Sequence, residues 1–170
     1  MLVGHSMGGT VVLEVAARVP ELPRAVVLLD AAPIVGGSPA VALAAEVAAA
    51  LSGPDGHAAR DALIEHAVSA LSRDPDLQES VRRDMRAVPD HVASSCVATM
   101  GEWDGEAVAG ACRVPVLHVA AEDPINDAAA LRALNPLVRT GQTVGAGHFH
   151  QLEVPGQVNA TIERFLAVAI

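Results

Sequence analysis

The feature that most restricts the fold of this chain is the stretch Gly4-His5-Ser6-Met7-Gly8 with its flanks. Two apolar residues, Leu2 and Val3, lead into the first glycine, and apolar residues at helical spacing follow the second until Pro20. A serine placed between glycines in this G-x-S-x-G pattern is typical of a sharp turn between a strand and a helix. The segment therefore predicts a short strand, a tight turn at the serine and a helix with one buried face.

Two continuous apolar runs predict strands that are buried on both faces, as in a parallel sheet. Residues 25–29 form a run that ends at Asp30, and residues 116–120 form one that ends before Glu122-Asp123-Pro124. A weaker strand fits residues 142–144. Helical patterns cover residues 127–134 and the segment that begins at Pro155. This alternation favours an α/β fold with a parallel sheet of about four strands flanked by helices.

A long helical segment separates the second expected strand from the third. It covers residues 34–112, and turn sequences such as Gly53-Pro54-Asp55-Gly56 divide it. Its expected helices are residues 39–51, 57–71, 76–87 and 90–101. We therefore expect a single domain, residues 1–170, with residues 34–112 as an insertion within it.

Composition and charge exclude several classes of function. The 170 residues carry a formal charge of −9, with 20 acidic residues against 11 basic ones, so we expect no nucleic-acid partner. The alanine-rich run at residues 40–51 is too short to span a membrane, and neither a signal peptide nor a membrane segment is expected. Cys96 and Cys112 form no metal-binding or CxxC pattern. A reduced, cytoplasmic protein is the default expectation.

Three polar residues follow expected strands in an order that suggests nucleophilic catalysis. A serine hydroxyl needs a base to accept its proton, and the base works best when a carboxylate fixes its tautomer. In an open α/β sheet, ligands bind beyond the carboxyl ends of the strands. Ser6, Asp123 and His148 each follow an apolar run or the last expected strand. They are our candidates for nucleophile, acid and base.

At these residues the chain resembles the α/β-hydrolase fold superfamily. The resemblance rests on Gly4-His5-Ser6-Met7-Gly8-Gly9 for the nucleophile turn, Val114-Pro115-Val116-Leu117 leading to Glu122-Asp123-Pro124 for the acid, and the histidine segment at residues 147–153. It covers the whole chain except the middle segment, which corresponds to a helical cap inserted at the family's usual place.

The resemblance implies a serine hydrolase that cleaves a carboxylic ester or a related small acyl substrate through an acyl-enzyme, without a cofactor. Ser6 would be the nucleophile, His148 the base and then the acid, and Asp123 the orienting carboxylate. The backbone N–H of Met7, at the positive end of the first helix, would donate to the oxyanion. Gly4 and Gly8 would keep the tight turn free of side chains. Acyl transfer and thioester cleavage use the same triad and remain open.

Other readings of the acid and the base remain open. Asp30, which closes the second strand, is the nearest rival for the acid, because some relatives carry it there. Asp123 could instead cap the following helix, as Asp127 is expected to do. His150 lies two residues from His148, and the pair could suggest a metal site. We expect no metal, because no cysteine or carboxylate cluster accompanies them.

Several further residues have both a structural and a functional interpretation. His5 is expected to be structural or to line the substrate pocket, and His118, within an apolar strand, to be a hydrogen-bonded core histidine. Trp103 and Met100 are candidates for the acyl pocket, together with Met85, although helix packing would look the same. Glu153 is expected to be structural, near the amino end of the last helix.

The position of the serine so early in the chain leads to a separate set of expectations. In the family, several strands and helices normally precede the turn, and one of those loops supplies the second oxyanion N–H. The sequence suggests a truncated form of the domain. Loss of one oxyanion donor lowers the rate by about 10²- to 10³-fold, so a weakened catalyst or a non-catalytic remnant that needs a partner is expected. An uncovered sheet edge would also favour a homo-oligomer.

Overall fold

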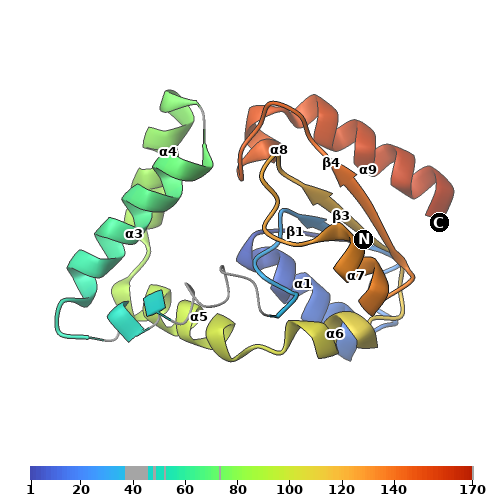
Figure 1. Cartoon of the computed structure of the whole chain (residues 1–170), viewed down its shortest axis with the longest axis horizontal. Coiled ribbons are helices and arrows are strands. Elements are labelled where there is room, and N and C mark those ends of the chain that lie inside the picture. Colours follow the sequence, from blue (N-terminus) through green and yellow to red (C-terminus); the bar gives the residue numbers. More distant parts are fainter. Residues whose placement is uncertain (37–45, 48, 52, 73, 170) are drawn as a thin grey trace. The chain divides into compact units, whose positions relative to one another are not determined.

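The computed structural model of the chain describes residues 1–36, 46–47, 49–51, 53–72 and 74–169 (Figure 1). These residues belong to two compact units. One contains residues 1–36 and 104–170, and the other contains residues 37–103. The sheet and the candidate site lie in the first unit.

The sheet is parallel and has four strands in sequence order. Every neighbouring pair is parallel, in the order β1-β2-β3-β4, with Leu28 of β2 opposite both Gly4 of β1 and His118 of β3. The bounds of the strands are β1 (Leu2–His5), β2 (Val26–Leu29), β3 (Val116–Ala120) and β4 (Val138–Gln142). The predicted α/β class and the four-stranded parallel sheet are therefore confirmed.

The position of the fourth strand was predicted wrongly. The sequence suggested residues 142–144, whereas β4 covers Val138–Gln142 and shares only Gln142 with that range. β4 lies at the edge of the sheet, and its central residues are partly or fully exposed. An edge strand does not need a continuous apolar run, so the sequence pattern gave no clear signal there. Val144, an apolar residue within the predicted strand, lies in the loop after β4 and is 72 % exposed.

Helices cover both faces of the sheet. In Figure 1, α9 runs along one side, and α1, α6 and α7 lie on the other. The helices of this unit are α1 (Met7–Arg18), α6 (Gly105–Ala111), α7 (Ala128–Leu134), the short α8 (His150–Glu153) and α9 (Pro155–Ala169). The helices predicted after Ser6, over residues 127–134 and from Pro155 are therefore present.

The core between the sheet and α9 explains why the strands β2 and β3 could be predicted from the sequence. Val27, Leu29 and Val119 pack with Val158 and Phe165 of α9, and all five are almost completely buried. Every residue of β2 and β3 is buried, which is the environment of a central parallel strand. These two strands fix the middle of the sheet and carry the loops that form the candidate site.

The second unit is helical in the part that the structure describes. Its main helices are α3 (Gly56–Leu71), α4 (Pro75–Ala87) and α5 (Asp90–Glu102), close to three of the predicted ranges. The fourth predicted range, residues 39–51, falls largely outside the described residues. Arg60 is buried, forms an ion pair with Asp90 and donates to the carbonyl of Met85. This arginine joins α3 to both of the other helices.

The two units divide the chain at positions slightly different from those predicted. The helical unit is residues 37–103, whereas the expected insertion was residues 34–112. The segment at residues 104–112, including α6, belongs to the sheet unit, where Ala109 and Cys112 are buried. Among the described helices, none combines the length and apolar character needed to cross a bilayer.

Candidate functional site

The predicted turn between a strand and a helix is present at Ser6, and its backbone is strained. Ser6 has φ 52° and ψ −123°, in a region that non-glycine residues rarely occupy. Its N–H donates to the carbonyl of Leu29, and its own carbonyl accepts from the N–H groups of Gly9 and Ala32. These bonds hold the turn against the end of β2. Such strain costs of order 1–3 kcal/mol and persists only where the surroundings hold it.

Of the two glycines predicted to keep the turn free of side chains, Gly4 is confirmed in that role and Gly8 is not. A Cβ atom on Gly4 would lie 2.1 Å from the carbonyl oxygen of Gly8, so the close approach of the helix to β1 requires a glycine there. A Cβ on Gly9 would lie 2.6 Å from Cβ of Ala31. A Cβ on Gly8 would meet no atom within 4 Å. Gly4 and Gly9 are therefore the crowded positions, and the prediction for Gly8 is wrong.

His148 forms a buried hydrogen bond with Asp30. Nδ1 of His148 lies 2.7 Å from Oδ2 of Asp30, and the two residues are 6 % and 1 % exposed. Because a carboxylate can only accept, Nδ1 carries the proton and Nε2 has a free lone pair. Within the described residues, Nε2 makes no hydrogen bond. This tautomer can accept a proton from a hydroxyl group.

The structure places Asp30, and not Asp123, against His148. Asp123 is exposed, in the loop between β3 and α7, and no described residue forms a hydrogen bond with its side chain. The prediction that Asp123 grips the imidazole is therefore wrong in this structure, and its rival Asp30 occupies that place. The two aspartates follow neighbouring strands, so sequence position alone did not separate them. The path of the loop that carries His148 decides which carboxylate it meets.

Asp30 also has a backbone conformation that is rare for a non-glycine residue, and hydrogen bonds to β3 and the loop after it hold it in place. Asp30 has φ 38°, and its N–H donates to the carbonyl of Val119 at 2.8 Å. Its Oδ1 accepts from the N–H of Ala121 at 3.4 Å, while Oδ2 faces His148. The carboxylate thus reaches from the end of β2 across to the end of β3 and the histidine loop.

Asn126 is a buried residue near this site that was not predicted from the sequence. Its Nδ2 donates to the carbonyl of Ala31 at 2.8 Å, and its Oδ1 accepts from the N–H of Ile34 at 2.7 Å. It therefore joins the loop after β3 to the loop that follows Asp30. The only signal in the sequence was a polar residue in a loop after a strand, which is too common to be informative.

His5 positions the loop that carries His148. Nε2 of His5 lies 2.9 Å from the carbonyl oxygen of His148, and the two ring centroids are 4.5 Å apart. Burial and the nearby His148 lower the pKa of His5 to about 4, so the ring is neutral at pH 7 and Nε2–H donates. The His5 ring also contacts Phe149. Because Ser6 follows His5 directly, the turn and the histidine loop lie at the same end of β1.

The N–H group of Met7 is the predicted oxyanion donor, and this role stays a prediction. Met7 begins α1 directly after Ser6, and no described residue accepts a hydrogen bond from its N–H group. The first N–H groups of a helix lack intrahelical partners and carry its positive end. The Ser6 hydroxyl also makes no hydrogen bond among the described residues. Both groups are available to a ligand.

Two further histidines are buried near Asp30. Neither ring nitrogen of His118 has a hydrogen-bond partner among the described residues, so the expectation of a hydrogen-bonded core histidine is wrong there. Burial lowers the pKa of His118 to about 4, although the Asp30 charge acts in the opposite direction. His150 is fully buried, its Nδ1 lies 3.0 Å from Oγ1 of Thr143, and burial lowers its pKa. Both rings are neutral at pH 7.

The remaining predicted residues lie away from these contacts or in the other unit. Met100 lies within α5 and Trp103 directly follows it, and both are half-buried in the helical unit. Their role in an acyl pocket stays a prediction. Glu153 accepts from the N–H of Gly147 at 3.0 Å, so it supports the histidine loop. Within the described residues, no three His, Cys, Asp or Glu side chains are placed to hold a metal ion.

The chain was compared with known families and proteins. The profile described as the alpha/beta hydrolase family matches residues 1–161. A comparison with curated proteins returned no match.

Solved structures with the same fold include several that are named as esterases or lactonases. An enol-lactonase from Burkholderia xenovorans is 24 % identical with a TM-score of 0.73, over 97 % of this chain and 64 % of its own. An esterase from Exiguobacterium antarcticum is 15 % identical with a TM-score of 0.81, over 98 % of this chain and 66 % of its own. A thermophilic esterase from Thermogutta terrifontis is 21 % identical with a TM-score of 0.75, over 98 % and 64 % respectively. The chain thus spans slightly less than two thirds of the length of these proteins.

Proposed function

The chain belongs to the alpha/beta hydrolase family, and on that premise we propose that it is a serine hydrolase of carboxylic esters. The observation that carries this proposal is the buried hydrogen bond between Asp30 and His148, at the same end of the sheet as the strained turn of Ser6. A lactone is a cyclic ester and would react by the same steps. The proposed substrate class is therefore a small ester or lactone.

In the first half of the reaction, Ser6 is acylated. Its Oγ attacks the carbonyl carbon, and its proton moves to Nε2 of His148, which is free to accept it. The carbonyl oxygen becomes an oxyanion near the N–H of Met7 and the positive end of α1. When the intermediate collapses, the bond to the leaving alcohol breaks, and His148 returns the proton to that oxygen.

In the second half, water releases the acyl group. His148 takes a proton from the attacking water, the oxyanion forms again, and the acid leaves as the proton returns to Oγ of Ser6. Throughout, Asp30 accepts from Nδ1–H of His148, and its negative charge stabilises the imidazolium that forms in each half. No cofactor takes part in these steps.

Labelling with a fluorophosphonate probe tests the proposal directly. The probe should form a covalent adduct at Ser6, located by peptide mass spectrometry, and Ser6→Ala should abolish it. His148→Ala should reduce the labelling rate by several orders of magnitude. Absence of labelling in a folded wild-type sample would favour a non-catalytic protein, the second interpretation of the sequence.

Product analysis then separates hydrolysis from acyl transfer. A p-nitrophenyl ester is supplied in water, with and without an added alcohol or thiol acceptor. We expect free carboxylic acid as the main product. A dominant transfer product would keep the serine mechanism and replace water by another acceptor.

A further inference from the structure

Three arginines gather around β4, at the opposite edge of the sheet from β1. They are Arg132 of α7, Arg139 of β4 and Arg164 of α9, and all three are exposed. The chain has only 11 basic residues and a net charge of −9, so a cluster of three cations is unexpected by composition.

No carboxylate balances these arginines within the part of the chain that the structure describes. Arg132 donates to the hydroxyl of Thr140, while Arg139 and Arg164 have no hydrogen bond or ion pair with a described residue. Other arginines of the chain, such as Arg18 and Arg86, do pair with carboxylates. Like charges held close together without a counter-charge repel each other, and an anion would relieve this.

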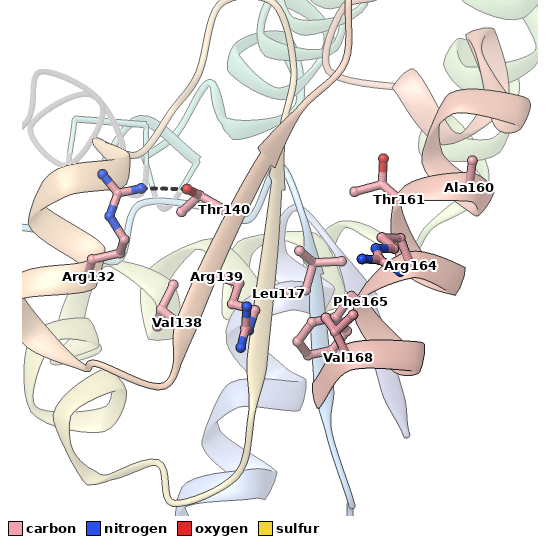
Figure 2. Close-up of a pocket in the computed structure, with 10 residues that line it drawn as sticks. All are labelled: Leu117, Arg132, Val138, Arg139, Thr140, Ala160, Thr161, Arg164, Phe165 and Val168. Carbon is pink, nitrogen blue, oxygen red and sulfur yellow. Dashed lines mark hydrogen bonds between the residues drawn. The ribbon is translucent and has the colours of Figure 1, made fainter. Parts of the chain in front are cut away.

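The arginines surround a pocket with an apolar floor. The pocket has a volume of about 760 Å³ and lies over β4 and one face of α9 (Figure 2). Arg139 is in register with Leu117 of β3, so the two side chains point to the same face of the sheet, toward α9. From α9 the lining residues are Ala160, Thr161, Arg164, Phe165 and Val168, whose spacing places them on one side of the helix.

Polar and apolar groups are separated within this pocket. Leu117 and Phe165 are almost completely buried and form the floor, and Val168 extends it while remaining 44 % exposed. In Figure 2 the side chains of Arg139 and Arg164 lie between β4 and α9, and Arg132 approaches from the other side of β4. A ligand that fits would carry a negative charge at one end and an apolar group at the other. The volume lies in the range of small-molecule sites.

We propose that this pocket binds an amphipathic anion, with a carboxylate or phosphate head held by Arg139 and Arg164 and an apolar chain on Val168 and the exposed edges of Leu117 and Phe165, while Arg132, on the other side of β4, adds only its positive charge. Guanidinium groups bind both kinds of oxyanion by paired hydrogen bonds. The site does not include Ser6, His148 or Asp30, and the inference does not depend on the proposed hydrolase activity. Its ligand would be an effector or a bound acid, and not the reacting ester.

Calorimetric titration of the full chain tests this site. The probes are decanoate, decyl phosphate and inorganic phosphate, each at concentrations at which it stays monomeric. We expect both decyl probes to bind, and to bind more weakly as salt increases, because salt screens exposed charges. The double substitution Arg139→Gln with Arg164→Gln should weaken binding by about tenfold, since each exposed contact is individually modest. Arg24→Gln, at an exposed arginine outside the pocket, is the matched control and should change nothing.

Further variants separate this site from the candidate active site and test whether a negative charge beside the arginines opposes binding. Ser6→Ala should keep the same affinity for decanoate, whatever the outcome of the fluorophosphonate experiment. Val168→Glu should weaken binding at least as much as the double arginine variant, because it places a carboxylate beside the arginines. Circular dichroism of each variant confirms that it is folded.

The comparison of probes also identifies the source of the ligand and can overturn the proposal. Tighter binding of decanoate supports a fatty-acid-like ligand, and tighter binding of decyl phosphate supports a lipid phosphate head group. Equal binding of inorganic phosphate and decyl phosphate would show that the apolar floor has no role, and would overturn the proposal. Unchanged binding in the double arginine variant would overturn it as well.

Discussion

Asp30 and His148 are 118 positions apart in the chain, yet Oδ2 of the aspartate lies 2.7 Å from Nδ1 of the histidine. This hydrogen bond holds the loop after β2 against the loop after β4. It also fixes the imidazole tautomer that the proposed mechanism requires.

The first prediction concerns the identity of the acid. Asp30→Asn should lower kcat for ester hydrolysis by about 10³- to 10⁴-fold, because an amide cannot hold the correct tautomer or stabilise the imidazolium. Asp123→Asn is the matched control and should stay within a few-fold of wild type, since that side chain is exposed. Steady-state kinetics on a p-nitrophenyl ester measures both variants. The reverse order of effects would assign the role to Asp123 and contradict the arrangement described above.

The second prediction concerns the crowded turn. Gly4→Ala should destabilise the protein by about 3 kcal/mol or more, because the added Cβ would meet the backbone of Gly8 and the helix would have to move. Gly8→Ala has open space and should change the unfolding free energy by less than about 1 kcal/mol. Urea unfolding followed by circular dichroism compares the two. Similar losses in both variants would mean that the turn is not packed as described.

The third prediction assigns His5 a positioning role. His5→Ala removes the donor to the His148 carbonyl and should lower kcat by about 10- to 100-fold through misplacement of the imidazole. His5→Gln keeps an N–H group at a similar reach and should restore most of the activity. If the two variants are equally impaired, the effect comes from lost ring packing on His148 and Phe149, and the positioning role is refuted.

The fourth prediction is a loss of stability in acid. His5 and His118 have pKa values lowered to about 4, so between pH 4 and 6.5 the folded chain binds fewer protons at these rings than the unfolded chain does. Stability should therefore fall as pH decreases through this range. Protonation of His118 should lower the free energy of unfolding by on the order of 3 kcal/mol. This loss is complete only below about pH 4.

A substitution isolates the contribution of His118 to this loss. His118→Leu removes a buried ring with two unpaired nitrogens and should leave stability at pH 7 unchanged or raised. The variant should also show a smaller loss between pH 6.5 and 4, measured by urea unfolding at several pH values. An unaltered pH dependence in His118→Leu would mean that the ring titrates normally.

The sequence by itself determined the parts of the fold that depend on local pattern. Residues 25–29 and 116–120 were recognisable as central strands because burial on both faces requires continuous apolar side chains. The turn at Ser6 could be predicted because the helix begins so close to the strand that residue 4 must be a glycine. The edge strand β4 was misplaced, since half-exposed residues carry no such pattern.

Only the tertiary structure decided which carboxylate meets His148, what His5 binds and which arginines share a pocket. Asp30 and Asp123 both follow buried strands, and in the sequence they satisfy the same rule. The choice depends on the path of the loop after β4 and on the bonds from His5 and Asn126 that hold the neighbouring loops. Such contacts join residues far apart in the chain, where the geometry of the whole sheet, and not local preference, sets the distance.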